Sequence, residues 1–180
     1  FVQDFLAARL AQPRLCIDAT CGNGGDTAFL CGITAPEGKV VGFDVQEAAI
    51  ASTRKHLEQL GVPAARYELH CQSHADLLQI VQPGTADAVM FNFGWLPGAA
   101  HDVHSTADST LPALQAGLDA LKPGGVLAAV LYSGKVIGDA EKQAALAFFR
   151  TLPLTKYTVL VCEFANWADT APLPCFVIKK

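Results

Sequence analysis

A glycine-rich segment near the start of the chain constrains the fold more than any other feature. It reads Asp-Ala-Thr-Cys-Gly-Asn-Gly-Gly-Asp-Thr over residues 18–27, and it begins at the end of a short apolar segment, residues 15–19. Glycines at such a point let the backbone turn sharply and lie flat against a ligand. Apolar residues at helical spacing follow over residues 26–34. A strand, a tight loop and a helix in this order predict an α/β domain that binds a ligand at the loop.

The rest of the chain alternates between strand-like and helix-like segments. The expected strands are residues 15–19, 39–44, 66–70, 86–91, 126–132, 157–164 and 175–179, and the expected helices are residues 1–11, 26–34, 47–60, 75–81, 106–121 and 140–150. Strands that alternate with helices form a parallel sheet with right-handed crossovers. The last two strands lie close together in the sequence and must pair antiparallel. Residues 1–180 are therefore expected to form a single α/β domain with the class I methyltransferase (Rossmann-like) fold, a seven-stranded mostly parallel sheet with an antiparallel C-terminal hairpin, rather than a dehydrogenase.

Composition and charge narrow the class of protein further. A formal net charge of −4 argues against a protein that coats nucleic acid, because such binding depends on neutralising phosphates; it is compatible with a local basic cluster that grips one small RNA element. The longest apolar runs are too short to span a bilayer. No signal peptide is expected, and because the chain starts at Phe1 rather than Met, a few native residues are expected to precede it. Six cysteines are scattered without Cys-x-x-Cys spacing, so a reduced, cytoplasmic protein with no metal site is expected.

The charges around the glycine-rich segment indicate the kind of ligand. A dinucleotide-binding enzyme places a pyrophosphate at such a loop, but here Asp18 precedes the glycines and Asp26 follows them. Carboxylates, together with the amide of Asn23, suit a ligand with an ammonium group and a sulfonium charge, and S-adenosylmethionine has both. A structural role alone is the alternative for Asp18.

Two later positions fit the adenosine part of the same ligand. Asp44 ends the second expected strand, where a carboxylate can accept hydrogen bonds from both ribose hydroxyls, and Gln46 is close enough to help. Ser73 and His74 follow the third strand, where class I methyltransferases contact the adenine. The alternatives are a buried structural role for Asp44, a helix cap for Ser73 and an ordinary surface position for His74.

The segment after the fourth strand suggests an acceptor site. It reads Asn-Phe-Gly-Trp-Leu-Pro-Gly over residues 92–98, and an Asn separated by two residues from an aromatic is the spacing of the Asn-Pro-Pro-aromatic motif of methyltransferases that act on amines. The carbonyl of Asn92 can accept hydrogens of an amine and direct its lone pair, and the face of Trp95 can hold a planar base or a developing positive charge. The alternative is a turn in which Trp95 packs in the core and Asn92 bonds to backbone.

The polar stretch that follows, residues 99–106, is expected to form the mouth of the pocket. His101 can accept a proton or contact a phosphate, and a solvated loop histidine is the alternative. Thr106 fits a helix cap as well as a ligand contact.

Taken together, these motifs resemble the MnmM (YtqB-like) family of S-adenosylmethionine-dependent tRNA wobble-uridine methyltransferases, long labelled rRNA methylases. The resemblance covers nearly the whole chain and is carried, in order, by residues 18–24, 42–46, 73–74, 92–98 and 121–125. It implies transfer of a methyl group to the aminomethyl nitrogen of 5-aminomethyl-2-thiouridine at the wobble position, which gives 5-methylaminomethyl-2-thiouridine and S-adenosyl-L-homocysteine. The implied partner is the tRNA anticodon stem-loop, and a homodimer is one possible assembly.

The loop chemistry and the resemblance together assign roles to individual residues. The predicted cofactor contacts are Asp18, Gly22, Asn23, Gly24, Asp26, Thr27, Asp44, Gln46, Ser73, His74 and Asn92. The predicted catalytic residues are Asn92 and Trp95, and the predicted substrate contacts are Trp95, Pro97, Gly98 and His101. The family usually has Tyr where Trp95 stands, Gly-Asp-His and a Thr-rich run after the Pro-Gly, and a histidine where Lys135 stands, so the chain departs from the family on the acceptor side.

Other functions remain open from the sequence. RNA contacts are expected from a cluster drawn from Arg9, Arg14, Lys135, Lys142 and Lys156. The first alternative function is a methyltransferase for rRNA, for a small molecule or for a protein amine. The second is a non-catalytic or NAD-binding Rossmann domain. For the methyltransferase, direct in-line transfer is expected, with no covalent enzyme intermediate, because a neutral primary amine is already a nucleophile and needs mainly alignment.

Overall fold

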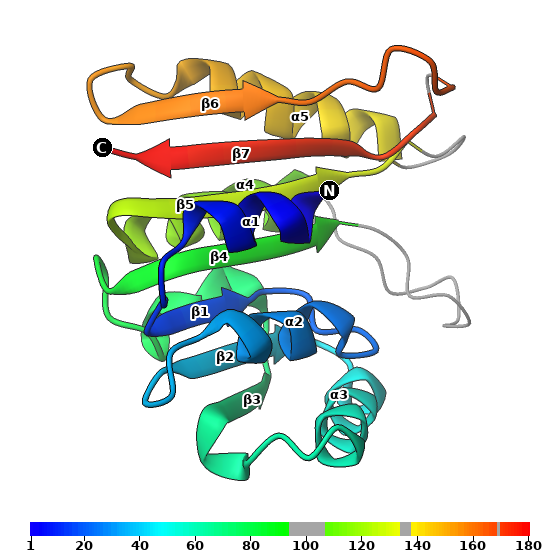
Figure 1. Ribbon diagram of the computed structural model, residues 1–180. Coiled ribbons are helices and arrows are strands. Elements are labelled where there is room, and N and C mark those ends of the chain that lie inside the picture. Colours follow the sequence, from blue (N-terminus) through cyan, green and yellow to red (C-terminus); the bar gives the residue numbers. More distant parts are fainter. Residues whose placement is uncertain (94–106, 134–137, 169) are drawn as a thin grey trace.

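The computed structural model describes residues 1–93, 107–133, 138–168 and 170–180. Its centre is a seven-stranded sheet with the strand order β3-β2-β1-β4-β5-β7-β6 (Figure 1). The strands are β1 (Leu15–Asp18), β2 (Lys39–Asp44), β3 (Tyr67–Cys71), β4 (Ala86–Phe93), β5 (Leu121–Leu131), β6 (Tyr157–Val161) and β7 (Leu173–Lys179). The helices are α1 (Val2–Arg9), α2 (Gly25–Ile33), α3 (Glu47–Gln59), α4 (Ala107–Ala120) and α5 (Gly138–Thr151), with short 3₁₀ helices η1 (Ala64–Arg66) and η2 (His74–Gln79).

The pairing of the strands confirms the predicted fold class. Strands β3, β2, β1, β4 and β5 run parallel to one another, whereas β7 is antiparallel to both β5 and β6. From β1 the chain continues to β2 and β3 on one side of the sheet, and it then returns to place β4 on the other side of β1. The direction of the strand order therefore changes between β1 and β4. In an open α/β sheet, ligands bind outside the carboxyl ends of the strands at such a switch point.

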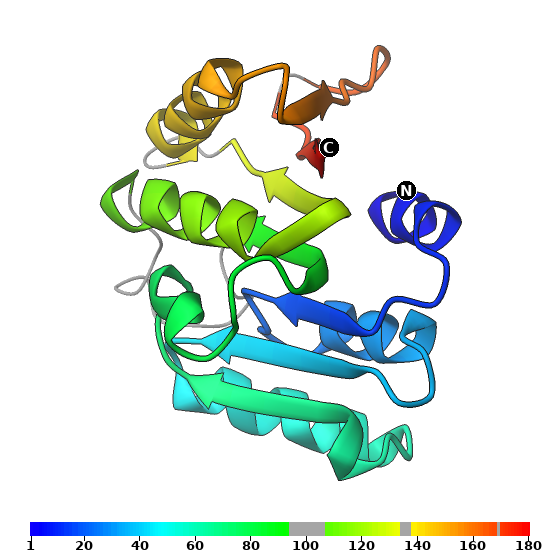
Figure 2. The ribbon, with the colours of Figure 1, turned by 90° about the vertical axis from the view of Figure 1, so that its left-hand side faces the viewer.

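Helices cover both faces of the sheet, as Figure 2 shows. Helices α1, α2 and α3 lie on one face, and η2, α4 and α5 lie on the other. Each face has its own apolar core: Leu6, Leu30 and Leu57 are fully buried on the first, and Leu77 and Leu114 on the second. Among the described helices, none combines the length with the apolar character that a bilayer crossing requires.

Several element boundaries differ from the sequence-based prediction. Strand β4 runs to Phe93 instead of residue 91, because Asn92 and Phe93 continue the pairing with β5. The segment after β3 forms a 3₁₀ helix, His74–Gln79, instead of an α-helix over residues 75–81.

The Lys-Pro-Gly-Gly segment, residues 122–125, lies inside β5 rather than before it. Ala86 pairs with Leu121 but Ala88 pairs with Val126, so these residues form a bulge. Gly124 has a φ of +82° there, a value that L-residues with side chains rarely adopt. The Lys122 ammonium forms an ion pair with the buried Asp87 carboxylate.

Candidate active site

The glycine-rich loop, residues 19–25, lies at the carboxyl end of β1 and is bonded to both neighbouring strands. The N–H of Ala19 donates to the carbonyl of Met90 in β4 at 2.8 Å, and the N–H of Cys21 donates to the carbonyl of Phe43 in β2 at 3.0 Å. Gly24 has a φ of +83°, and a Cβ there would stand 3.0 Å from the Cα of Thr53. The loop can therefore pack against α3 only with glycine at this position.

Asp18 is fully buried directly below the loop. Its Oδ2 accepts a hydrogen bond of 2.6 Å from the Thr27 hydroxyl, and its Oδ1 accepts one of 3.1 Å from the N–H of Thr20. Burial, reinforced by the charges of Asp26 and Asp44, raises the pKa of Asp18 to about 7. Asp18 thus ties the loop to the first turn of α2, and direct contact with a cofactor stays a prediction.

Asp44 lies at the end of β2 and is half-buried. Its two carboxylate oxygens accept the N–H of Gly22 at 3.0 Å and the N–H of Gln46 at 2.9 Å. A carboxylate oxygen has more than one lone pair, so each oxygen can accept a further hydrogen from a ligand. This arrangement suits the predicted ribose contact.

Two helices hold the outer side of the loop. From α3, the Ser52 hydroxyl bonds to Asn23 Oδ1 at 3.3 Å and the Thr53 hydroxyl donates to the carbonyl of Gly22 at 3.2 Å. From α1, Gln3 Nε2 donates to Asp26 Oδ1 at 2.9 Å. Helix α1 therefore reaches the predicted cofactor site, a contact that the sequence did not suggest.

Ser73 and His74 lie on the other side of the loop. The Ser73 hydroxyl accepts the N–H of Ala75 and caps η2, so the capping role is present and an adenine contact stays a prediction. His74 is half-buried, with its ring edge-on to those of Phe91 and Phe93. Its Nδ1 is 3.0 Å from the carbonyl of Ala19.

The hydrogen-bond partner of His74 determines which ring nitrogen carries the proton. Because a carbonyl only accepts hydrogen bonds, Nδ1 of His74 must carry a hydrogen. Burial lowers the pKa of His74, against the opposing effects of the Ala19 carbonyl and of the Asp44 and Glu141 carboxylates. The imidazole is therefore neutral near pH 7, and its Nε2 can accept a hydrogen bond. His74 supports the underside of the loop, unlike the ordinary surface residue of the alternative prediction.

Asn92 lies inside β4, one residue before the strand ends. Its N–H donates to the Thr20 hydroxyl at 2.8 Å. Its side-chain Oδ1 is buried and has no hydrogen-bond donor among the described residues. Buried polar atoms without partners are rare in proteins and are often found at functional sites.

Tyr132 lies beside the candidate site and was not assigned to it from the sequence. It directly follows β5, next to β4, and its phenol is near the side chain of Asn92. Burial and the charge of Asp26 raise the pKa of Tyr132, while the neighbouring Asn92 amide opposes this. The available signal was its position, since it is the first polar residue after the apolar run of a strand that ends at the ligand-binding edge.

The remaining acceptor-site predictions lie outside the described residues. They are Trp95, Pro97, Gly98 and His101, together with Thr106 and Lys135. Their roles stay predictions.

The basic residues expected to bind RNA are spread over both edges of the sheet. Arg14 directly precedes β1 and Lys156 directly precedes β6, so both lie at the amino edge, away from the glycine-rich loop. Arg9 ends α1, which leads back to the start of β1. Lys142 is different, because its ammonium donates at 2.8 Å to the hydroxyl of Ser133, which follows the carboxyl end of β5. Of the described candidates, only Lys142 lies on the same edge as Asn92.

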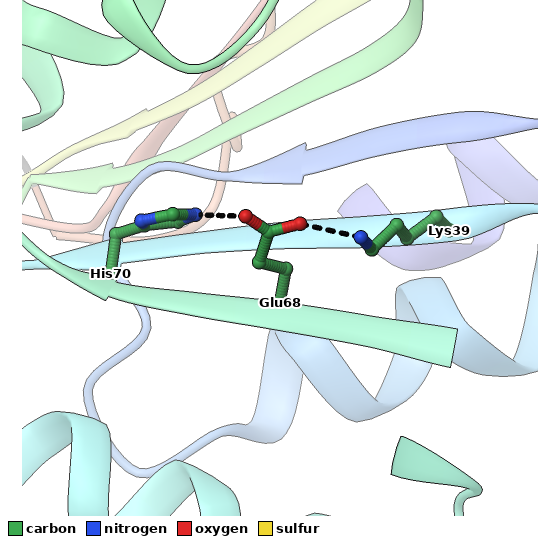
Figure 3. Close-up of polar contacts among 3 residues, drawn as sticks. All are labelled: Lys39, Glu68 and His70. Carbon is green, nitrogen blue, oxygen red and sulfur yellow. Dashed lines mark hydrogen bonds and ion pairs between the residues drawn. The ribbon is translucent and has the colours of Figure 1, made fainter. Parts of the chain in front are cut away.

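An ion-pair network lies away from the site, on β2 and the edge strand β3. Figure 3 shows Glu68 between Lys39 and His70, with one carboxylate oxygen toward each. The hydrogen bond from Lys39 lowers the pKa of Glu68. Glu68 also lines a hollow of about 320 Å³ that contains none of the predicted site residues. This network joins two strands and takes no part in the candidate site.

The electrostatics of the site favour a cationic ligand. Three carboxylates, from Asp18, Asp26 and Asp44, surround the loop, and none of them forms an ion pair with a Lys or Arg in the described part of the chain. A diphosphate would be repelled here, whereas an ammonium or sulfonium group would be attracted. The donor set therefore fits S-adenosylmethionine.

Comparisons with known proteins agree with this fold and with S-adenosylmethionine as the cofactor. A family model described as "Putative rRNA methylase" matches residues 40–178. A protein of Clostridium thermocellum with the same description has a crystal structure that is 33% identical and superposes with a TM-score of 0.93, covering 99% of this chain and 95% of that one. A protein of Streptococcus mutans, described as a putative methyltransferase and crystallised with S-adenosylhomocysteine, is 37% identical with a TM-score of 0.87, over 99% of this chain and 95% of that one.

A relative from Arabidopsis thaliana has a more specific name. It is the chloroplastic tRNA (mnm(5)s(2)U34)-methyltransferase, 33% identical over 175 residues, which are 91% of this chain and 62% of the relative. The chain therefore spans less than two thirds of that protein. Because the methylase family model matches most of the chain and the solved relatives match it over nearly their whole length, the chain belongs to this rRNA methylase family, the MnmM (YtqB-like) family that its sequence motifs resemble.

Proposed function

We propose that the protein is an S-adenosylmethionine-dependent N-methyltransferase that acts on the wobble uridine of tRNA. Its substrate is the aminomethyl nitrogen of 5-aminomethyl-2-thiouridine, and its product is 5-methylaminomethyl-2-thiouridine. The observation that carries the proposal is the buried Oδ1 of Asn92, beside the glycine-rich loop, which has no hydrogen-bond donor among the residues that the structure describes. Such an acceptor oxygen, next to a loop that suits a methyl-donating cofactor, fits a substrate that brings N–H groups.

The cofactor side of the proposal rests on the three carboxylates and the loop. Asp44 binds the ribose hydroxyls, Asp26 provides a negative charge that favours a cation, and Asp18, whose pKa is raised to about 7, adds to this charge only when it is ionised. The backbone of the loop, held by β2, β4 and α3, presents a fixed surface to the ligand. S-adenosylmethionine carries the methyl group on a positively charged sulfur. The amine nitrogen takes this methyl group directly, and S-adenosylhomocysteine is left.

The acceptor side rests on Asn92 and its neighbours. The Asn92 carbonyl accepts a hydrogen of the amine and aims the nitrogen lone pair, and the Tyr132 phenol lies near the Asn92 amide. A proton leaves the amine after transfer, so a strong general base is not required. Trp95 is the predicted stacking surface for the base, with Pro97, Gly98 and His101 as further substrate contacts.

The choice of tRNA as partner is supported by the family and by the relative in Arabidopsis thaliana. The anticodon stem-loop presents the wobble base unpaired, and single-stranded loops are the usual targets of base-specific RNA recognition. With a net charge of −4, the protein is expected to bind RNA weakly and with strong dependence on salt.

Mass spectrometry of tRNA nucleosides tests this function. Purified protein and S-adenosylmethionine are incubated with tRNA that carries 5-aminomethyl-2-thiouridine, and matched tRNA without the aminomethyl group serves as the control substrate. The proposal predicts 5-methylaminomethyl-2-thiouridine in the first reaction and no new methylated nucleoside in the second. An unchanged aminomethyl nucleoside would disprove the substrate assignment.

A small-molecule acceptor is the second candidate. It is favoured by the acidic net charge and by the position of Arg14 and Lys156 on the edge opposite the site. A relative in an Acidovorax species, 35% identical over 131 residues, is named trans-aconitate 2-methyltransferase, although these residues are 41% of that protein. Methyl transfer to small acids or amines but not to tRNA would support this candidate.

A further inference from the structure

The hydroxyl of Thr20 accepts a hydrogen bond from β4 where a backbone carbonyl of the neighbouring strand would otherwise accept it. Strands β1 and β4 pair up to Asp18 and Met90, and the last bond of the ladder runs from the N–H of Ala19 to the carbonyl of Met90. Beyond Ala19 the chain leaves β4, and Cys21 bonds to β2 instead. The N–H of Asn92, two residues after Met90, faces the same side and would lack a partner in the ladder. The Thr20 hydroxyl accepts it at 2.8 Å.

Thr20 is itself held firmly by the loop. Its N–H donates to the Oδ1 of the buried Asp18, whose other oxygen accepts the hydroxyl of Thr27 in the first turn of α2. Three hydrogen bonds therefore connect helix α2, the glycine-rich loop and the end of β4. A side chain that lacks the hydroxyl at residue 20 would break this connection at its last step.

The position of Asn92 depends on this connection because β4 ends one residue later, at Phe93. On its other side β4 is paired with β5 through Val130 and Leu131. On the side of the glycine-rich loop, the N–H of Asn92 is held by its hydrogen bond to the Thr20 hydroxyl. The buried amide oxygen of Asn92 has no donor among the described residues, so the position of this amide depends on how the backbone at Asn92 is held.

We propose that Thr20 is a positioning residue for methyl transfer, and that its hydroxyl sets the distance between the Asn92 amide and the cofactor loop. The inference rests on the role proposed for Asn92. Thr20 acts on the acceptor side although it lies in the cofactor loop. Reaction rates depend steeply on such distances, and a misplacement of about 1 Å can cost roughly a hundredfold.

Three variants test the inference. Thr20→Val removes the hydroxyl and keeps the shape, Thr20→Ser restores a hydroxyl, and Thr85→Val makes the same substitution at an exposed threonine before β4. Single-turnover methylation of aminomethylated tRNA is measured at saturating cofactor, alongside S-adenosylmethionine affinity by calorimetry. Thr20→Val should be about 10- to 100-fold slower with a cofactor Kd within about threefold of wild type, and Thr20→Ser should recover most of the rate.

A second measurement needs no acceptor. The chain contains three asparagines, Asn23, Asn92 and Asn166, so asparagine-selective ¹⁵N labelling gives three backbone amide signals. Thr20→Val should accelerate hydrogen exchange at Asn92 and leave Asn166 unchanged, whereas Thr20→Ser should retain the protection. Unchanged exchange at Asn92 in the valine variant would disprove the hydrogen bond and overturn the inference.

The outcomes separate this inference from the proposed function. If the wild-type protein methylates no tRNA, the proposed function fails. The role of Thr20 is then tested by the hydrogen-exchange rate of the Asn92 backbone amide in the Thr20 variants. If Thr20→Val transfers as fast as Thr85→Val, the positioning role is wrong even though the bond exists. If Thr20→Val loses rate only in proportion to weaker cofactor binding, Thr20 serves the cofactor and the inference is again wrong.

Discussion

The two halves of the candidate site satisfy their polar groups in different ways. On the cofactor side, both oxygens of Asp18 and both oxygens of Asp44 accept hydrogen bonds from the protein itself. On the acceptor side, the buried Oδ1 of Asn92 has no donor within the described residues. The described polar groups of the cofactor side therefore find their partners within the protein, whereas on the acceptor side we propose that the substrate supplies the donor for Asn92.

This difference has an energetic meaning. A buried acceptor without a partner costs about 1–3 kcal/mol of folding free energy, and a donor that arrives with the substrate recovers part of that cost. The carboxylates of Asp18 and Asp44 instead form hydrogen bonds that stabilise the loop, in addition to their predicted contacts with the ligand. We therefore expect substitutions on the acceptor side to lower the rate of transfer, and substitutions on the cofactor side to lower affinity and stability.

The largest effect is expected for Asn92→Ala. Removal of a single aligning group that acts in the transition state typically costs about 10²- to 10³-fold in rate, so turnover should fall by roughly that factor while cofactor Kd changes by less than about threefold. Asn166→Ala, in the exposed segment after β6, is the matched control. Near-normal turnover of Asn92→Ala in a steady-state assay would show that the acceptor side does not control the rate of transfer, and the proposed difference between the two halves would be wrong.

Asp44→Ala should show the opposite behaviour. It removes the acceptor for the Gly22 and Gln46 N–H groups and the predicted ribose contact. Hydrogen bonds to charged groups contribute about 1.5–3 kcal/mol, so S-adenosylmethionine affinity should fall about 10- to 100-fold, with turnover at saturating cofactor nearly unchanged. Calorimetry measures this, with Asp4→Ala, at a largely exposed carboxylate, as the control. A normal Kd for Asp44→Ala would contradict the assignment.

The meeting of the glycine-rich loop, Asp18 and Asp44 at one edge of the sheet could be predicted from the sequence because its signals are local. The glycines at 22 and 24, the acid at 18 and the acid at 44 each stand at the end of an apolar strand segment, and parallel strands bring their carboxyl ends to one edge. The fold class followed from the same alternation of strands and helices, with the closing hairpin as the decisive feature.

The contacts that join the two halves could not be predicted in this way. Thr20 and Asn92 are 72 positions apart, and nothing in the sequence around either residue indicates that a hydroxyl completes the ladder between their strands. The contact between Tyr132 and Asn92 likewise depends on the pairing of β4 with β5. Asp87 illustrates the same limit, since it bonds to the N–H groups of Arg14 and Leu15 and to Lys122.

The raised pKa of Asp18 predicts that the free energy of unfolding depends on pH. Its pKa is raised from an ordinary 3.8 to about 7, so the folded protein holds a proton that the unfolded chain releases. The stabilising contribution is complete below about pH 3.8 and is lost as the pH rises to about 7. Within this window Asp18 removes about 1.4 kcal/mol of unfolding free energy per pH unit.

Urea unfolding of the wild type and of Asp18→Asn at several pH values measures this contribution. The free energy of unfolding of Asp18→Asn relative to wild type should increase between pH 4 and pH 7 and then stay level. A constant difference across that range would show that Asp18 titrates at its ordinary value.

The smallest effect is expected for Glu68→Gln, outside both halves. The contacts of Glu68 with Lys39 and His70 are partly exposed to solvent, and ion pairs at the protein surface contribute about 0–1 kcal/mol. Thermal unfolding should shift by a few degrees at most, with cofactor Kd and turnover unchanged. A loss of cofactor affinity in this variant would mean that the β2–β3 edge is coupled to the site.

The most direct test of the proposed site is a crystal structure of this protein with S-adenosylhomocysteine. We predict that the ribose hydroxyls bond to Asp44, that the amino-acid part lies along the glycine-rich loop, and that the sulfur faces the side chain of Asn92. A ligand bound away from this loop, or an Asn92 amide turned away from the sulfur, would contradict it.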